Sequence, residues 1–216
     1  MLALRLGDLK GPPTVLCIGA HCDDIEIGCG GTLVRWAREY PTARLIWAIF
    51  GGEPGRVEES RHAASRLVGS LPGLELKFHD FRGSYFPTEF AQIKDAFERL
   101  KGTIRPDVVL THFLHDRHQD HALLGELTWN TFRSHLILEY EIPKYEGDLG
   151  HPNLFVPLSA EDLARKVDVL MECFPSQRVR SWFTEDTFRG LARLRGIECA
   201  APSGFAEAFH ARKLCL

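Results

Sequence analysis

The sequence predicts an α/β fold in which a mainly parallel sheet is covered by helices on both faces. Two observations predict it. Through the first two thirds of the chain, apolar runs of strand length alternate with segments of helix length, which is the pattern of βαβ units. In addition, two clusters of histidine and aspartate each follow an apolar run directly, at the carboxyl end of an expected buried strand. These clusters are Ala20-His21-Cys22-Asp23-Asp24 and His115-Asp116-Arg117-His118-Gln119-Asp120-His121.

The first half of the chain supplies three strand–helix units. The run Val15-Leu16-Cys17-Ile18 is apolar throughout, so residues 14–20 are expected to form a buried strand, and residues 31–40 the first helix. A second strand is expected over 43–50, separated by the loop Gly51-Gly52-Glu53-Pro54-Gly55 from a helix over 56–69. A third strand over 74–80 leads to a helix over 88–101.

The fourth unit ends the regular alternation. The run Val108-Val109-Leu110 indicates a strand over 107–112, followed by a helix over 118–133, and all crossovers should be right-handed. A further strand is expected over 136–142, and residues 144–153 are rich in turn formers. Ser159 and Asp162 have the spacing of a capping box, which predicts a helix over 159–173, while 176–216 is left unassigned.

Taken together, the elements predict a Rossmann-like sheet with the active site at the C-terminal edge of its strands. No internal repeat, low-complexity segment or linker interrupts the 216 residues, so we expect a single domain over 1–216. Hydrophobic content of 44% and charged content of 25% are those of a soluble globular protein.

Charge and cysteine usage exclude several classes of function. A net charge of −3 gives no electrostatic reason to bind nucleic acid or an anionic membrane. Residues 1–10 lack the apolar core of a signal peptide, and no apolar run is long enough to span a bilayer. The six cysteines form no C-x-x-C pair, which favours free thiols in a reducing cytoplasm.

The two clusters have the composition of a divalent-metal site. His21 and Asp24 are three residues apart in a turn, and His118 and His121 are three apart at an expected helix start, so each pair can share a face. Zinc hydrolases commonly use three protein ligands and leave a fourth position for water. Two imidazoles and one carboxylate suit Zn²⁺, and Fe²⁺ or Co²⁺ also fits such ligands. An aspartate and a histidine then remain for general acid and base roles.

Simpler explanations exist for each cluster alone. Asp23 and Asp24 before a helix can be a helix cap with dipole-favoured acids, and a lone surface histidine–aspartate pair is usually only solvated. The glycines at 28, 30 and 31 lack the spacing of a dinucleotide-binding turn, which disfavours a nucleotide-binding module but leaves it as an alternative. Position 116 is aspartate where metallo-β-lactamase-like hydrolases carry the first histidine of their motif, so that fold is rejected.

The chain resembles the PIG-L family, the LmbE-like zinc-dependent de-N-acetylases. The family motif A-H-P-D-D, often continued by E-x-G-x-G-G-T, is similar to residues 20–32, and its H-x-D-H motif is similar to residues 118–121. Weaker similarities are Arg56-Val57-Glu58-Glu59, Lys166 with Ser176-Gln177, and Ala206-Glu207-Ala208-Phe209. The resemblance therefore covers nearly the whole chain. Cys22 departs from the motif, which has proline there, and we expect its side chain to point away from the metal.

The resemblance implies a role for each motif residue. It makes His21, Asp24 and His121 the ligands of one zinc ion, Asp23 the general base, and His118 the group that protonates the leaving amine or stabilises the oxyanion. It makes Asp120 the partner that orients the His118 ring and raises its pKa.

The activity implied is removal of acetyl from an N-acetylglucosamine-type amino sugar or its conjugate, a small-molecule substrate. The alternative is an amidohydrolase acting on another acylated amine of a natural product. Relatives often form homo-oligomers. The expected substrate-binding residues are Arg56, Asp80, Arg82 and Tyr85, with residues 140–145 as a further wall.

Overall fold

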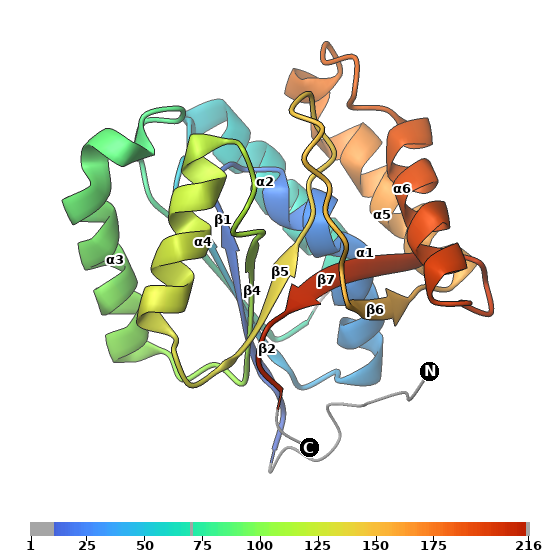
Figure 1. Ribbon diagram of the computed structural model, residues 1–216, viewed down its shortest axis with the longest axis horizontal. Helices are drawn as coiled ribbons and strands as arrows, with labels where there is room; N and C mark the ends of the chain where they lie inside the picture. The colour runs from blue at the N-terminus through green and yellow to red at the C-terminus, as the bar shows by residue number, and fades with distance from the viewer. Residues whose placement is uncertain (1–10, 70, 215–216) are drawn as a thin grey trace.

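In a computed structural model, which describes residues 11–69 and 71–214, a seven-stranded sheet runs in the order β3-β2-β1-β4-β5-β7-β6 (Figure 1). Neighbouring strands from β3 to β5 pair in parallel, whereas β7 pairs antiparallel with both β5 and β6. The expected α/β class with a mainly parallel sheet is therefore confirmed. The strands are β1 (Thr14–Gly19), β2 (Arg44–Ile49), β3 (Gly73–Phe78), β4 (Val108–His112), β5 (Leu136–Tyr140), β6 (Leu154–Pro157) and β7 (Ala206–Ala211).

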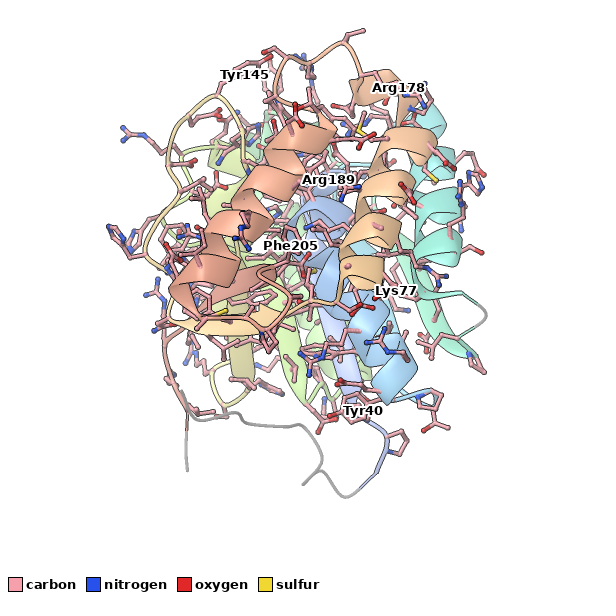
Figure 2. All side chains as sticks on the ribbon, turned by 90° about the vertical axis from the view of Figure 1, so that its right-hand side faces the viewer. Tyr40, Lys77, Tyr145, Arg178, Arg189 and Phe205 are labelled. Atoms are coloured by element: carbon pink, nitrogen blue, oxygen red, sulfur yellow. The ribbon has the colours of Figure 1, made fainter. Side chains whose placement is uncertain are left out.

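Helices cover both faces of this sheet. One face packs against α1 (Asp24–Glu39), α2 (Pro54–Val68), α5 (Ala160–Cys173) and α6 (Glu185–Glu198), and Figure 2 shows α5 and α6 side by side over it. The other face packs against α3 (Phe90–Thr103) and α4 (Gln119–Thr131). Successive side chains of a strand point to opposite faces of the sheet. In β1, Val15 and Cys17 therefore pack into the core beneath α1, and Leu16 and Ile18 pack into the core beneath α3 and α4. None of the helices in the described ranges is long and apolar enough to cross a membrane.

The first helix differs from the sequence-based expectation. It begins at Asp24, seven residues before the expected start at Gly31, and it is kinked at Cys29, where φ is −144°. These positions inside the helix are glycine because neighbouring residues leave no room for a side chain. A Cβ at Gly28 would lie 2.2 Å from the Tyr140 ring, and a Cβ at Gly31 would lie 2.5 Å from Leu158. Close packing therefore explains the glycines at 28 and 31.

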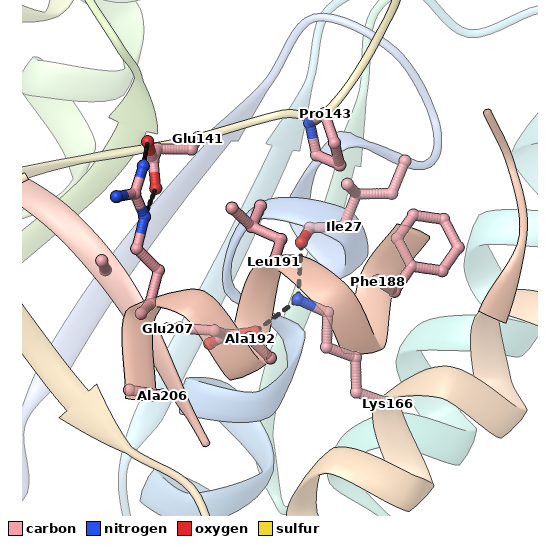
Figure 3. Close-up of a pocket in the computed structure, with 12 residues that line it drawn as sticks. Ile27, Glu141, Pro143, Lys166, Phe188, Leu191, Ala192, Ala206 and Glu207 are labelled. Atoms are coloured by element: carbon pink, nitrogen blue, oxygen red, sulfur yellow. Dashed lines mark hydrogen bonds and ion pairs between the residues drawn. The ribbon is translucent and has the colours of Figure 1, made fainter. Parts of the chain in front are cut away.

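Side chains from the C-terminal third hold the kink of α1. The Lys166 ammonium donates to the carbonyl oxygen of Ile27 and to Glu207 Oε1, both at 2.6 Å (Figure 3). The Glu207 carboxylate accepts the backbone N–H groups of Gly31 and Thr32 at 2.8 and 2.6 Å. Backbone groups released by the kink are thus satisfied by a buried ion pair, as buried polar groups require.

The C-terminal part contains the elements that the sequence left open. The capping box of Ser159 and Asp162 is confirmed at the start of α5. Strand β6 falls directly after the turn-rich segment, and α6 and β7 fill the unassigned tail. Short antiparallel strands without strict alternation give a weak sequence signal.

Candidate metal centre

The two histidine–aspartate clusters meet at the centre of the sheet. Strands β1 and β4 are neighbours, and the strand order reverses between them, so a crevice opens beyond their carboxyl ends. The turn after β1 carries His21 and leads into Asp24, the first residue of α1. After β4, His118 is the N-cap of α4 and His121 lies in its first turn.

The side chains of the three predicted ligands face one another closely. His21 Nδ1 lies 3.1 Å from His121 Nε2 and 3.4 Å from Asp24 Oδ2, and His121 Nε2 lies 3.5 Å from Asp24 Oδ1. Ligands 2.0–2.1 Å from a tetrahedral zinc ion are separated by about 3.3 Å, so these pairwise distances are those of a zinc site, although His21 and His121 face different oxygens of Asp24. Among the described residues, two sets of three ligand atoms lie within 4.8 Å of one another, and neither is the predicted set: His118 joins His21 and His121, and His112 joins Asp24 and His121.

The charges in this cluster favour a cation. Burial by itself would lower the pKa of His21, but the carboxylates of Asp24 and Asp120 outweigh it and raise this pKa to about 10. Burial and the neighbouring His112 lower the pKa of His121 to about 4, so its ring is neutral, as a metal ligand must be. The histidines hold the pKa of Asp24 well below its usual range despite complete burial. The carboxylates that stabilise a proton on His21 in the metal-free site would equally stabilise a divalent cation, which has to displace that proton to bind.

Asp23 lies beside this cluster but faces α2. Its Oδ1 accepts a hydrogen bond from Arg56 Nη2 at 2.5 Å, and its side chain is 6% exposed. Burial raises the pKa of Asp23, and this effect exceeds the opposing charge of Arg56. A buried carboxylate with a raised pKa is suited to accept a proton near neutral pH.

Asp120 does not have the partner that the sequence suggested. Its carboxylate lies 3.3 Å from His21 Nε2 and accepts the backbone N–H groups of Ser84 and Phe86, and no described hydrogen bond joins it to the His118 ring. Instead the Asp120 backbone N–H donates to His118 Nδ1 at 3.3 Å, which leaves the ring proton of neutral His118 on Nε2. Burial and the charge of His21 lower the pKa of His118 and outweigh the charge of Asp120, which does raise it as expected, so the net shift of this pKa is downward.

Two further residues contact the predicted ligands and were given no role from the sequence: His112, and Asp116 of the second cluster. His112 ends β4 fully buried, stacks on His121 with ring centres 4.0 Å apart, and lies 3.3 Å from Asp24 Oδ2. Asp116 Oδ2 lies 3.0 Å from His121 Nδ1. The position of His112 at the end of a buried strand was a usable signal, whereas the contact of Asp116 depends on how the loop folds back.

The predicted substrate residues lie at varied distances from the cluster. Arg56 reaches it directly through Asp23, whereas Asp80 is exposed and forms a β-bridge with Gly51. Arg82 stacks over the Tyr85 ring at 3.7 Å, in an exposed segment that borders His21 at Gly83.

Other neighbours have structural roles. Tyr140 is fully buried and forms no wall, whereas Tyr145 is 65% exposed, in the loop at the top of Figure 2. Burial raises the pKa of the Cys22 thiol to about 12, and its Sγ faces the carbonyl oxygen of Gly51 rather than the ligands, as expected. The cavity beside Lys166 holds only about 20 Å³, too little for a sugar.

Comparisons with known proteins identify relatives of this chain. The family model described as PIG-L, GlcNAc-PI de-N-acetylase, matches residues 16–132, which include both clusters. A protein of Escherichia coli K12 named uncharacterized deacetylase YaiS is 33% identical over 143 residues, which are 60% of this chain and 74% of that protein.

Solved structures share the fold. N,N'-diacetylchitobiose deacetylase from Pyrococcus horikoshii superposes with a TM-score of 0.70 at 20% identity, over 96% of this chain and 86% of that one. The 4-carboxy-2-hydroxymuconate hydratase GalB from Pseudomonas putida KT2440 superposes with a TM-score of 0.72 at 18% identity, over 94% and 98% of the two chains. The same fold therefore carries more than one reaction.

Proposed function

The chain belongs to the PIG-L family, GlcNAc-PI de-N-acetylase, and from this premise we propose that it is a zinc-dependent deacetylase of an N-acetylated amino sugar or its conjugate. The observation that carries the proposal is the close approach of His21, Asp24 and His121, whose facing nitrogen and oxygen atoms lie 3.1–3.5 Å apart, with the buried carboxylate of Asp23 next to them. Those are the parts that metal-assisted amide hydrolysis requires.

In this proposal His21, Asp24 and His121 hold the metal, and Asp23 accepts a proton from the attacking water. A bound zinc ion would polarise the acetamide carbonyl and lower the pKa of water toward neutrality. The ion pair with Arg56 holds Asp23 in place, and the raised pKa of Asp23 suits it to keep the proton.

His118 has a defined part in stabilising the tetrahedral oxyanion. Because its Nδ1 accepts the Asp120 backbone N–H, its Nε2 carries the proton and is available as a donor to the developing oxyanion. The proton collected by Asp23 can then pass to the leaving amine, which gives acetate and a free amine. A lowered pKa keeps His118 neutral in this role.

Two alternatives carry different predictions. An amidohydrolase for another acylated amine would prefer longer acyl groups or a non-sugar amine over N-acetylglucosamine conjugates. A nucleotide-binding module is disfavoured because Asp24 and Glu26 occupy the first turn of α1, where a pyrophosphate would have to bind.

We also propose that the protein works in a reducing compartment such as the cytoplasm. The five described cysteines, which are all free and buried, support this proposal.

The proposal is tested by substituting Asp23 with asparagine in zinc-loaded protein. We expect deacetylation of N-acetylglucosamine conjugates to fall by about 10²–10⁴-fold, the usual contribution of a general base, while bound zinc stays near one per chain. The control is Asp168→Asn, which changes an exposed residue of α5 and should leave the rate unaltered. Loss of zinc from Asp23→Asn would move Asp23 into the ligand set, and an unchanged rate would exclude it as the base.

The substrate class needs a separate panel. N-acetylglucosamine, N,N'-diacetylchitobiose, an inositol-linked N-acetylglucosamine and the same amines with longer acyl chains should be compared at equal concentration. Preference for acetyl on a sugar supports the proposal, whereas turnover confined to long acyl chains supports the alternative.

A further inference from the structure

We propose that Asp116 and Asp120 are positioning residues, each of which orients one metal-binding histidine from its far ring nitrogen and fixes one backbone segment beside the site. The inference rests on the proposed metal site and deepens it. It departs from the assignment of Asp120 to His118, because the carboxylate of Asp120 contacts a different histidine.

The Asp120 carboxylate connects the His21 ring to the backbone of Ser84 and Phe86. Its side chain is fully buried, and its Oδ2 lies 3.3 Å from His21 Nε2 while also accepting the Ser84 N–H at 2.5 Å. Its Oδ1 accepts the Phe86 N–H at 3.1 Å. Ser84 has a φ of +67°, a conformation that non-glycine residues adopt only when other contacts hold them there. Both oxygens of Asp120 thus receive N–H donors, which an ionised carboxylate accommodates.

Asp116 has the equivalent place on His121. Its side chain is 3% exposed, its Oδ2 lies 3.0 Å from His121 Nδ1, and its Oδ1 accepts the His118 backbone N–H at 2.8 Å. Lys144 Nζ also donates to Oδ2 at 3.0 Å, and it pairs with Asp148 at 2.7 Å. The Lys144 side chain is only 7% exposed. The loop after β5 is therefore anchored on the same carboxylate.

The two histidines present different ring nitrogens to the site. His21 presents Nδ1 to the site and His121 presents Nε2, and these two nitrogens lie 3.1 Å apart. In each ring the other nitrogen faces its carboxylate. A histidine whose far N–H is held in this way has a fixed tautomer and orientation, and its free nitrogen is the better metal ligand. Asp116 and Asp120 thus set the two imidazoles for the ion without touching it.

The experiment measures zinc affinity by competition with a chromophoric chelator, for Asp116→Asn and Asp120→Asn. An amide cannot accept N–H donors on both of its heavy atoms, so each variant should bind zinc about 10–100-fold more weakly. The matched control is Asp162→Asn, since the buried Asp162 carboxylate also accepts a backbone N–H, from Ser159, and N–H groups from Arg38, but at the start of α5. Its zinc affinity should equal that of the wild type.

Amide hydrogen exchange assigns each effect to its residue. Asp120→Asn should speed exchange at Ser84 and Phe86 and leave His118 unchanged, whereas Asp116→Asn should do the reverse. If Asp120→Asn does not fold, adding Ser84→Gly relieves the positive φ and supplies no acceptor for His21, so the zinc measurement can be made in that double variant.

Three outcomes separate the proposals. Wild-type zinc affinity in both aspartate variants would overturn the inference while leaving the proposed function intact. Weakened zinc binding with the predicted exchange pattern supports it, even if no deacetylation is found and the proposed function fails. A wild-type protein that binds no zinc would overturn both.

Discussion

Replacing Gly28 with alanine tests whether packing on α1 sets the geometry of the metal site. A Cβ there would lie 2.2 Å from Cδ2 of Tyr140 and 2.6 Å from Cγ, whereas ordinary contact begins near 3.4 Å. The ring cannot move freely, because Tyr140 is fully buried and its hydroxyl donates to the Ile18 carbonyl at 2.6 Å. Overpacking of this kind destabilises a fold by about 1–3 kcal/mol. Since Tyr140 packs against His112, which contacts Asp24, zinc affinity should also fall.

The assay is urea unfolding of the metal-free protein, followed by the chelator competition. Gly190→Ala is the matched control, because Gly190 lies inside α6 and an added Cβ would meet nothing within 4 Å. Better helix propensity should stabilise that variant by about 0.5–1 kcal/mol. If Gly28→Ala unfolds at the same urea concentration as the wild type, the Tyr140 ring adapts and the reasoning is wrong.

Three further predictions concern the metal, the α1 kink and acid stability. Dialysis against EDTA should lower the thermal midpoint and abolish deacetylation, with zinc restoring both; a midpoint indifferent to zinc would contradict the metal site. Lys166→Met should cost about 3–5 kcal/mol in urea unfolding because it leaves Glu207 buried and unpaired, and the Lys166→Met/Glu207→Gln pair should cost less. Burial alone would raise the pKa of Asp162, but hydrogen bonds from Arg38 and the Ser159 backbone outweigh it, so this pKa is lowered on folding. Its contribution is present at neutral pH and lost as pH falls below about 4, and Asp162→Asn should flatten that acid limb in a pH series of unfolding curves.

Much of the central sheet could be predicted because its signals are local. The runs around Val15 and Val108 are apolar over a whole strand, and a strand buried on both faces requires that pattern. The first seven residues of α1 were not predicted, because glycine has low helix propensity and nothing near Gly28 in the chain indicates that Tyr140 fills the space above it. Strand β7 was missed for a related reason: its pairing with β5 and β6, which are distant in the chain, makes it a strand, and its own residues give only a weak pattern.

The sequence by itself determined which residue types the centre contains and that both clusters follow strands, because spacing along the chain fixes what shares a turn. It also indicated the family through residues 20–32 and 118–121. Only the tertiary structure decided which carboxylate faces which imidazole. Asp120 reaches His21 across 99 positions, and Lys144 reaches Asp116 across 28. Hydrogen bonds depend on directions and distances of a few ångströms, which loop conformation and packing set and local sequence pattern does not encode.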